Sequence, residues 1–205
     1  MKTISILGST GSIGRSALDV IKLHSDKFKV FALSGHENID LLFNQTLEFN
    51  PSYIVTKDKN SQSKLLALLK EKNLKTEILF GSEGHKFIAG HENVSIVLAA
   101  ITGSAGLIST MEAAKKGKRI LLANKESMVM AGDLLSRVCE QNNGLIIPVD
   151  SEHNAIFQVI HDQKNTDRIN KLILTASGGP FRNSPLEELQ NVKIEDALNH
   201  PNWDM

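Results

Sequence analysis

Three short polar clusters in the chain carry groups that could take part in chemistry. A glycine-rich turn occupies residues 8–14, a run with a lysine and a glutamate occupies residues 124–127, and two alternating carboxylates lie within residues 150–153. Glycine-rich backbone at the start of a helix can bind a phosphate, and paired carboxylates suit a hard divalent cation. The clusters therefore indicate a phosphate-bearing ligand and a metal ion.

The glycine turn has the spacing G-x-x-G-x-x-G and lies between an apolar run typical of a strand and a helical pattern. In a dinucleotide-binding turn, Gly8 allows the sharp change of direction and Gly11 the close approach of a pyrophosphate. Gly14 lets the helix pack closely on the strand. The spacing is one residue longer than that of the commonest fingerprint, so an ordinary glycine-rich turn stays an alternative.

The third cluster offers Asp150 and Glu152 as oxygen ligands for Mg²⁺ or Mn²⁺. The competing interpretation is a capped helix start, with Asp150 or Ser151 as the cap. The run from Asn124 to Ser127 has the same alternative, because asparagine and glutamate suit a first helical turn. All three clusters follow expected strands, and open α/β sheets bind ligands beyond the carboxyl ends of their strands. We therefore expect one shared site.

A second glycine pair and a histidine near the end of the chain are weaker candidates. Ser177, Gly178 and Gly179 offer a hydroxyl and backbone N–H groups suited to a phosphate. A loop that needs positive φ before Pro180 explains the same glycines equally well. His200 could contact an anion or face solvent.

Strands and helices alternate through residues 1–149 and predict a doubly wound, Rossmann-like parallel sheet of the α/β class. The expected strands are residues 3–7, 29–33, 52–56, 77–79, 95–99, 119–123 and 145–149. The expected helices are residues 12–24, 39–49, 61–72, 106–116 and 127–141, with a short helix and loops within 81–93. Asn50, Gly117 and Asn143 lie at expected turns or helix ends.

The pattern changes after Pro148. A helical stretch over 154–161, a polar loop over 162–170 and a strand over 171–175 are expected there. We therefore predict two domains, residues 1–149 and residues 150–205.

Composition excludes some classes of partner. The 205 residues include 23 basic and 23 acidic side chains, so the zero net charge gives no general attraction to nucleic acid or to an anionic membrane. The single cysteine, Cys139, has no internal partner for a disulfide, which favours a reducing compartment. With no signal peptide or membrane-spanning run recognised, we expect a cytoplasmic protein.

In combination, these runs closely resemble the 1-deoxy-D-xylulose 5-phosphate reductoisomerase family of the non-mevalonate isoprenoid pathway. Five runs match in the family's order, at residues 8–14, 121–127, 148–157, 177–182 and 200–203. The resemblance implies an oxidoreductase that uses NADPH and Mg²⁺ or Mn²⁺. Its reaction rearranges the carbon skeleton of 1-deoxy-D-xylulose 5-phosphate and then reduces the product to 2-C-methyl-D-erythritol 4-phosphate.

The resemblance also implies a role for each matching residue. Cofactor binding is expected of Gly8, Thr10, Gly11, Ser12, Ile13, Gly35, His36, Asn38, Asn124 and Glu126. Catalysis is expected of Lys125 and Glu152, and metal binding of Asp150 and Glu152. Substrate contacts are expected of Lys125, Ser151, Glu152, Ser177 and His200. Residues 150–205 then form the start of an α+β catalytic domain.

The chain departs from the family after the second strand, where a basic residue usually stands beside Asn38. Glu37 occupies that place here. A basic side chain favours the 2′-phosphate of NADPH, whereas NAD sites use an acidic one on the ribose hydroxyl. Ser34 and His36 are candidates to receive the phosphate, so the sequence specifies a nicotinamide cofactor more firmly than NADPH over NADH.

The family continues beyond the run at 200–203 with further phosphate-binding residues, a third metal-binding glutamate, a part that supports a homodimer and a C-terminal helical domain. We therefore expect this chain to be a fragment that binds nucleotide and has impaired turnover. Two alternatives stay open. One is another NAD(P)-dependent oxidoreductase, such as a semialdehyde dehydrogenase with a cysteine nucleophile, and the other is a non-catalytic nucleotide-binding fragment.

Overall fold

The structure is a computed structural model that describes residues 1–160, 169–173, 178–199 and 201. Contacts divide the chain into two compact units, Met1–Phe157 and Gln158–Met205, and each unit is considered by itself. The division falls later in the chain than the change of pattern at residue 149. All three polar clusters named above lie in the first unit.

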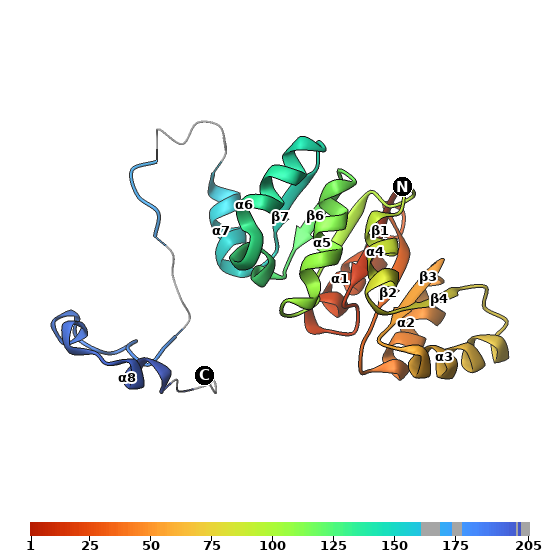
Figure 1. Cartoon of the computed structure of the whole chain (residues 1–205), viewed down its shortest axis with the longest axis horizontal. Coiled ribbons are helices and arrows are strands. Elements are labelled where there is room, and N and C mark those ends of the chain that lie inside the picture. Colours follow the sequence, from red (N-terminus) through yellow and green to blue (C-terminus); the bar gives the residue numbers. More distant parts are fainter. Residues whose placement is uncertain (161–168, 174–177, 200, 202–205) are drawn as a thin grey trace. The chain divides into compact units, whose positions relative to one another are not determined.

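The first unit is built on a seven-stranded parallel sheet with the order β4-β3-β2-β1-β5-β6-β7 (Figure 1). The strands are β1 (Lys2–Leu7), β2 (Phe28–Ser34), β3 (Tyr53–Thr56), β4 (Glu77–Phe80), β5 (Ile96–Ala99), β6 (Arg119–Leu122) and β7 (Leu145–Pro148). The chain runs from β1 to one edge and then returns to β5 on the other side of β1. This reversal creates a crevice at the carboxyl ends of β1 and β5, where open α/β sheets bind ligands.

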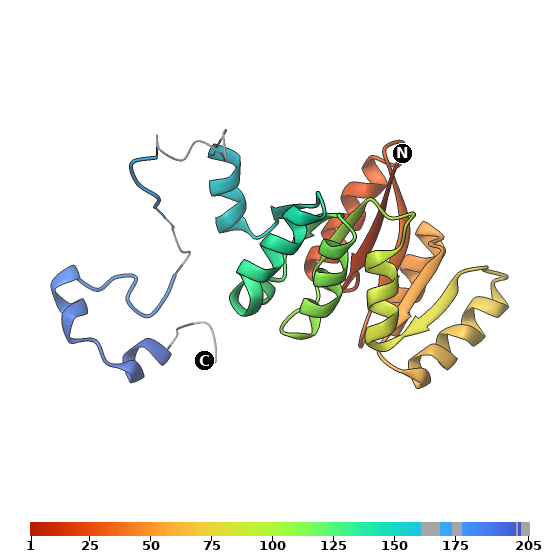
Figure 2. The same ribbon diagram turned by 45° about the horizontal axis from the view of Figure 1, so that its top comes forward.

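Helices cover both faces of this sheet (Figures 1 and 2). Buried side chains of α1 (Ser12–Leu23), α2 (Ile39–Phe49) and α3 (Lys59–Glu71) form one core, and those of α4 (Gly81–Gly90), α5 (Ala105–Lys115) and α6 (Lys125–Gln141) form the other. Neighbouring residues of a strand enter opposite cores, as Ile96 and Val97 do in β5. Because both faces are buried, the strands are predominantly apolar and β5 is entirely so, which agrees with the expected doubly wound fold.

Turn residues recognised in the sequence adopt the left-handed backbone expected of them. The φ angles are 43° at Asn50, 56° at Asn143 and 61° at Gly117. The N–H of Gly117 donates to the carbonyl of Ala114 at 3.0 Å, and the next N–H donates to Ala113 at 3.1 Å. These bonds satisfy carbonyls at the end of α5, as a glycine cap should.

Four helices differ from the expected pattern. α7 (Ser151–Val159) begins three residues before the expected start at 154, because Asp150 caps it through the N–H of His153, and it ends at Val159. α3 begins at Lys59 because Asp58 caps it, its Oδ1 accepting the N–H of Ser61 at 2.9 Å. α4 is a regular helix rather than a short one among loops. α6 is kinked at Ala131, where φ is −148° and ψ is 29°. The kink separates the start of α6, which carries Lys125, from the rest of the helix.

The second unit has short elements in its described part, the 3₁₀ helix η2 (Leu186–Asn191) and α8 (Ile194–Leu198). The strand expected over 171–175 is wrong for residues 171–173, which have no regular structure, and residues 174–175 lie outside the described part. A strand needs a partner for its backbone hydrogen bonds, and the described residues of this unit contain none. Within the described residues, no helix has the length and apolar character needed to cross a membrane.

Candidate functional site

The glycine turn follows β1 at the carboxyl edge of the sheet, and two of its glycines have no room for a side chain. Gly8 has a φ of +88°, and a Cβ there would lie 2.6 Å from the carbonyl oxygen of Ala100, just after β5. A Cβ on Gly14 would lie 2.4 Å from the carbonyl oxygen of Gly8 and 2.5 Å from the Cα of Ser9. The turn is therefore packed directly against the start of α1 and the loop after β5.

Gly11 has a different environment. In the described structure, the atom that a Cβ there would meet within 4 Å is the Gly8 carbonyl oxygen, at 3.5 Å. Gly11 is the N-cap residue of α1 and supplies no side-chain cap, and residues 11–13 are exposed. Open space beside a glycine and an uncapped helix start are what a pyrophosphate needs. The turn therefore fits the phosphate group of a dinucleotide.

Buried polar residues hold the turn in place. The N–H of Gly8 donates to Ser34 Oγ at 2.9 Å, and the N–H of Ser9 donates to the Ser34 carbonyl at 2.7 Å. Ser9 Oγ donates to Gln45 Oε1 at 2.7 Å, and Gln45 Nε2 donates back to the Ser9 carbonyl at 2.9 Å. Gln45 was not predicted from the sequence. The feature of the sequence that could have identified it is a polar residue on the buried face of an amphipathic helix, α2.

Residues 35–38 connect β2 to α2 beside the glycine turn. Gly35 is buried, and its N–H donates to the carbonyl of Val55 in β3 at 3.0 Å. A Cβ on Gly35 would lie 2.9 Å from Thr10 Cγ2 of the glycine turn. The structure therefore brings Gly35 and Thr10 into contact, and it leaves His36 exposed next to them.

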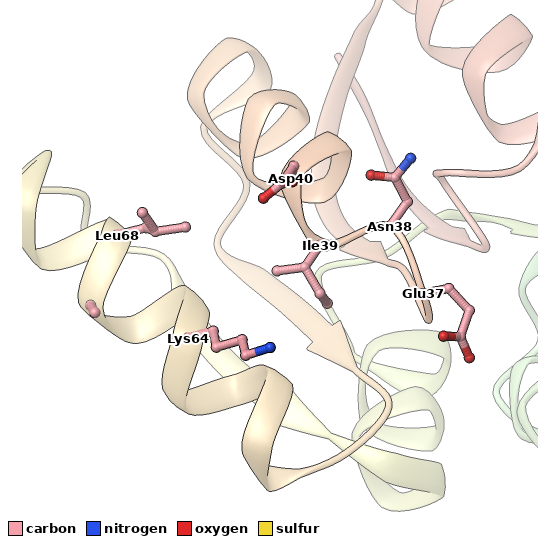
Figure 3. A pocket seen from close by; sticks show the side chains of 7 residues that line it. Glu37, Asn38, Ile39, Asp40, Lys64 and Leu68 are labelled. Carbon is pink, nitrogen blue, oxygen red and sulfur yellow. The ribbon is translucent and has the colours of Figure 1, made fainter.

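A surface hollow of about 720 Å³ adjoins this loop, lined by Glu37, Asn38, Ile39, Asp40, Lys64, Ala67 and Leu68 (Figure 3). Asn38 caps α2, its Oδ1 accepting the N–H of Leu41 at 2.9 Å. Lys64 extends from α3 toward Ile39 in the first turn of α2 (Figure 3). Glu37, on the other side of the loop, lies 3.0 Å from the ammonium of Lys57. Sequence reasoning missed Lys57, because it reaches this loop from the end of β3.

His85 of α4 is half-buried, and its Nδ1 donates to the Gly81 carbonyl at 2.8 Å. Burial lowers its pKa below the ordinary 6.5 against the opposing effect of the Gly81 hydrogen bond, and His36 lowers it further. Below pH 6.5 the unfolded chain therefore binds more protons than the folded one, so stability falls as the pH falls. We expect His85→Gln to reduce the loss of stability between pH 7 and pH 5, measured by urea unfolding. Equal losses in the variant and the natural chain would contradict this role.

Asn124 joins the loop after β5 to the start of α6. Its Nδ2 donates to the carbonyls of Ile101 at 2.7 Å and Gly103 at 2.9 Å, and lies 2.9 Å from Glu126 Oε2. Its Oδ1 accepts the N–H of Ser127 at 3.2 Å, so the expected helix cap is present. The side chain is 1% exposed. Asn124 therefore acts on any ligand here through the position of the two loops, and a direct cofactor contact stays a prediction.

Lys125, Ser151 and Glu152 lie together at the starts of α6 and α7 (Ser151–Val159), and all three are exposed. Ser151 Oγ donates to Glu152 Oε2 at 2.9 Å. This hydrogen bond lowers the pKa of Glu152, and the nearby ammonium of Lys125 lowers it further against the opposing charge of Asp150. Leu122 at the end of β6 pairs with Pro148 at the end of β7, so the second and third polar clusters follow neighbouring strand ends, as the shared-site prediction requires.

Asp150 caps α7, its Oδ1 accepting the N–H of His153 at 2.9 Å and lying 2.6 Å from His153 Nδ1. The capping interpretation is therefore correct, yet a carboxylate has enough lone pairs to bind a cation as well. Within the described residues, no three His, Cys, Asp or Glu side chains converge on a common metal position. Mg²⁺ is commonly held by one or two carboxylates together with water and substrate oxygens, so Asp150 and Glu152 fit it in donor type and number.

Two predicted substrate residues, Ser177 and His200, lie outside the described residues. Gly178 and Gly179 beside Ser177 are described, and Gly179 has a φ of +149°. A Cβ on either glycine would meet no atom within 4 Å in the described structure. The backbone at Gly179 thus agrees with the positive-φ alternative, and the phosphate role of Ser177 stays a prediction.

Cys139 is buried in α6, and burial raises the pKa of its thiol. A catalytic cysteine needs a lowered pKa and access to substrate. This thiol has neither, which argues against the semialdehyde dehydrogenase alternative.

Comparison with known proteins agrees with this geometry. A family model described as 1-deoxy-D-xylulose 5-phosphate reductoisomerase matches residues 4–132, and a model of that enzyme's C-terminal domain matches residues 146–205. The chain belongs to the 1-deoxy-D-xylulose 5-phosphate reductoisomerase family. The reductoisomerase of Lawsonia intracellularis is 50% identical over 204 residues, and that of Clostridium acetobutylicum is 48% identical over 205 residues. Both matches include 100% of this chain but 50% and 53% of the relatives, so it spans about half their length.

Solved reductoisomerases share the fold. A crystal structure of DOX-P reductoisomerase in complex with NADPH, fosmidomycin and magnesium has a TM-score of 0.83 and 43% identity, over 100% of this chain and 52% of its own. The Zymomonas mobilis reductoisomerase in complex with NADPH has a TM-score of 0.84 and 38% identity, over 98% of this chain and 52% of its own. The family resemblance and the Rossmann-like fold expected from the sequence are confirmed.

Proposed function

We propose that this chain is part of a reductoisomerase that converts 1-deoxy-D-xylulose 5-phosphate to 2-C-methyl-D-erythritol 4-phosphate with NADPH and a divalent cation. The observation that carries the proposal is that the runs with Lys125 and Glu152 follow the paired ends of β6 and β7, Leu122 and Pro148, at the sheet edge that also carries the glycine turn. Membership of the family supports it. So do the solved relatives, whose complexes contain NADPH and magnesium.

For the cofactor, we propose that N–H groups of the glycine turn bind the pyrophosphate. Thr10, Ser12 and Ile13 are the proposed donors, while Gly8 and Gly11, whose N–H groups donate to Ser34 Oγ and to the Gly8 carbonyl, shape the turn around the cofactor. The adenosine ribose lies toward Gly35, His36 and Asn38. Asn124 positions the loops at the other side of the crevice, and Glu126, whose carboxylate accepts from the Asn124 amide at 2.9 Å, is proposed to contact the cofactor. When bound, the nicotinamide supplies the hydride.

For the cation and the substrate, we propose Asp150 and Glu152 as ligands of Mg²⁺ or Mn²⁺. The Ser151 hydrogen bond lowers the pKa of Glu152, which keeps this carboxylate ionised and able to bind a cation to a lower pH than an ordinary glutamate. When bound, a divalent cation stabilises the negative charge that develops on substrate oxygens during carbon–carbon cleavage. Lys125 and Ser151 hold the oxygens of the sugar, and Ser177 and His200 hold its phosphate.

Domain limits, assembly and compartment are parts of the same proposal. We propose residues 1–149 as the NADPH-binding domain and residues 150–205 as the start of the catalytic domain. The family models, which match residues 4–132 and 146–205, support that division. A homodimer of the longer parent enzyme and a cytoplasmic location are consistent with a buried, unpaired Cys139.

A second candidate function is nucleotide binding without catalysis. It is favoured by one observation, which is that the open space at Gly11 and the uncapped start of α1 fit a pyrophosphate without any contribution from the residues at α6 and α7. In that case the glycine turn would bind a dinucleotide while the polar residues at α6 and α7 would not turn over substrate. The two functions share the cofactor and differ in the reaction.

The test measures binding and turnover separately on the 205-residue chain. We expect NADPH binding by fluorescence titration. In the presence of 1-deoxy-D-xylulose 5-phosphate and Mg²⁺ or Mn²⁺, the reductoisomerase proposal predicts NADPH oxidation. Absence of NADPH binding would refute the proposed function. Binding of NADPH without oxidation would favour the second candidate function instead.

A further inference from the structure

The end of β2 presents a charge problem for NADPH. In Rossmann-like folds, an acidic side chain at this place binds the ribose hydroxyls of NADH, whereas a basic one accommodates the 2′-phosphate of NADPH. Glu37 stands there, and its side chain is 80% exposed. Alone, its carboxylate would repel a 2′-phosphate. Another residue must supply positive charge if the chain is to prefer NADPH.

Lys57 supplies charge at this place from the next strand. It directly follows β3, which pairs with β2, and its ammonium lies 3.0 Å from Glu37 Oε1. The backbone bond from Gly35 to Val55 fixes the two strand ends beside each other. His36 Nδ1 is 3.9 Å from the same carboxylate oxygen. The ammonium of Lys57 and the imidazole of His36 therefore both lie near the carboxylate of Glu37 at this loop.

The pair between Lys57 and Glu37 is weak enough to exchange. The side chains are 48% and 80% exposed, and solvent screens pairs of this kind strongly. A phosphate carries more negative charge than a carboxylate and offers three strong acceptor oxygens. An ammonium on a flexible four-carbon stem can therefore leave the carboxylate for a phosphate within reach.

We propose that Lys57 is the specificity-determining residue for NADPH, and that it leaves Glu37 to bind the 2′-phosphate beside His36. The inference rests on the proposed function, since it assumes that a nicotinamide dinucleotide binds along the glycine turn. Glu37 holds the ammonium at the β2–α2 loop in the absence of ligand. The basic charge that the sequence lacks next to Asn38 thus comes from a residue about twenty positions further along the chain.

The experiment measures dissociation constants on the whole 205-residue chain for NADPH and NADH, and for the fragments 2′,5′-ADP and 5′-AMP. We expect the natural chain to bind 2′,5′-ADP more tightly than 5′-AMP. Lys57→Ala should weaken binding of NADPH and 2′,5′-ADP by about tenfold, the usual value of a hydrogen bond to a charged group, and leave NADH and 5′-AMP unchanged. Lys57→Arg, which keeps the charge, should retain the preference.

Two further variants sharpen the test. Glu37→Gln should strengthen NADPH binding by about two- to fivefold, because the ammonium no longer has to leave an exposed carboxylate. Lys70 is an exposed lysine in the last turn of α3, and Lys70→Ala is the matched control. It should leave the dissociation constants of all four ligands unchanged. Equal effects of Lys57→Ala on both ligand pairs, or no effect, would overturn the inference. If the natural chain binds neither dinucleotide, the proposed function fails instead.

Discussion

Replacing Gly14 with alanine is expected to lower the free energy of unfolding by about 2–3 kcal/mol, the cost of forcing a methyl group into packed atoms. The added Cβ would lie 2.4 Å from the Gly8 carbonyl oxygen and 2.5 Å from the Ser9 Cα, and both are backbone atoms that cannot rotate away. α1 would have to move off the turn, so dinucleotide binding should be lost as well. Urea unfolding followed by circular dichroism measures the first effect, and NADPH titration the second.

Gly11→Ala is the matched control, because it adds the same methyl group three residues earlier in the same turn. There the nearest described atom, the Gly8 carbonyl oxygen, would be 3.5 Å away, an ordinary contact. We expect stability to change by less than about 1 kcal/mol, since the position is a helix N-cap. Binding of NADPH should still fall by roughly 100-fold, because the methyl group occupies the space beside the uncapped start of α1.

The pair of variants separates packing from binding. If Gly14→Ala is as stable as the natural chain, the close approach of α1 to the turn is wrong. If Gly11→Ala binds NADPH normally, the pyrophosphate does not lie on this turn. If Gly14→Ala and Gly11→Ala lower the free energy of unfolding equally, the structure is wrong about the difference in free space at the two glycines.

The fold was predictable where local pattern and burial agree. Parallel strands covered on both faces are short apolar runs, and each of the seven in the first unit was expected within two residues of its bounds. Helix ends were predictable where a residue type has a fixed backbone role. Asn50 and Gly117 are examples, because their left-handed conformation is easy for asparagine and glycine.

The hydrogen bonds and ion pairs that hold the site in place could not be predicted from the sequence, because they join residues that are distant along the chain. Ser9 and Gln45 lie 36 positions apart, and nothing local in either segment shows that they bond. At the opposite edge of the sheet, Lys118 directly precedes β6 and is only 8% exposed, although lysine is usually a surface residue. Its ammonium donates to the carbonyls of His91 and Val94. Lys57 likewise reaches Glu37 only because β2 and β3 are neighbours.

At residues 171–173 the local pattern predicts a strand that the structure does not contain. Lys171, Leu172 and Ile173 belong to an apolar run of the kind that predicted every strand of the sheet correctly. Strand propensity describes how side chains fit a half-buried sheet, and backbone pairing has to come from elsewhere. Without a neighbouring strand in the described part of its unit, the same pattern does not produce a strand.

Asn124→Ala is the second change with a large expected effect, about 2–4 kcal/mol of stability. It removes the amide that donates to the Ile101 and Gly103 carbonyls, and it removes the cap of α6 at the same time. Each buried backbone group left unpaired costs about 1–3 kcal/mol. The loop after β5 and the start of α6 then lose their connection. NADPH binding should weaken with it, since both segments border the crevice.

Asn124→Asp tests whether the donors or the cap matter more. Aspartate keeps an oxygen for the N–H of Ser127, but it places a second oxygen where Nδ2 meets two carbonyls and the carboxylate of Glu126. We expect it to be at least as destabilising as alanine, because acceptors then face acceptors and like charges face each other. Asn124→Ser, which can cap without that repulsion, should be the mildest of the three.

Asn38→Asp is the control for a cap that faces solvent. Its side chain is exposed and its Oδ1 accepts the N–H of Leu41, so exchanging the amide for a carboxylate should change stability by less than about 0.5 kcal/mol. All five proteins can be compared by the same urea unfolding experiment. If Asn124→Asp proves as harmless as Asn38→Asp, the amide donors do not hold the two loops together. The stabilising role of Asn124 would then be that of a helix cap, through the N–H of Ser127.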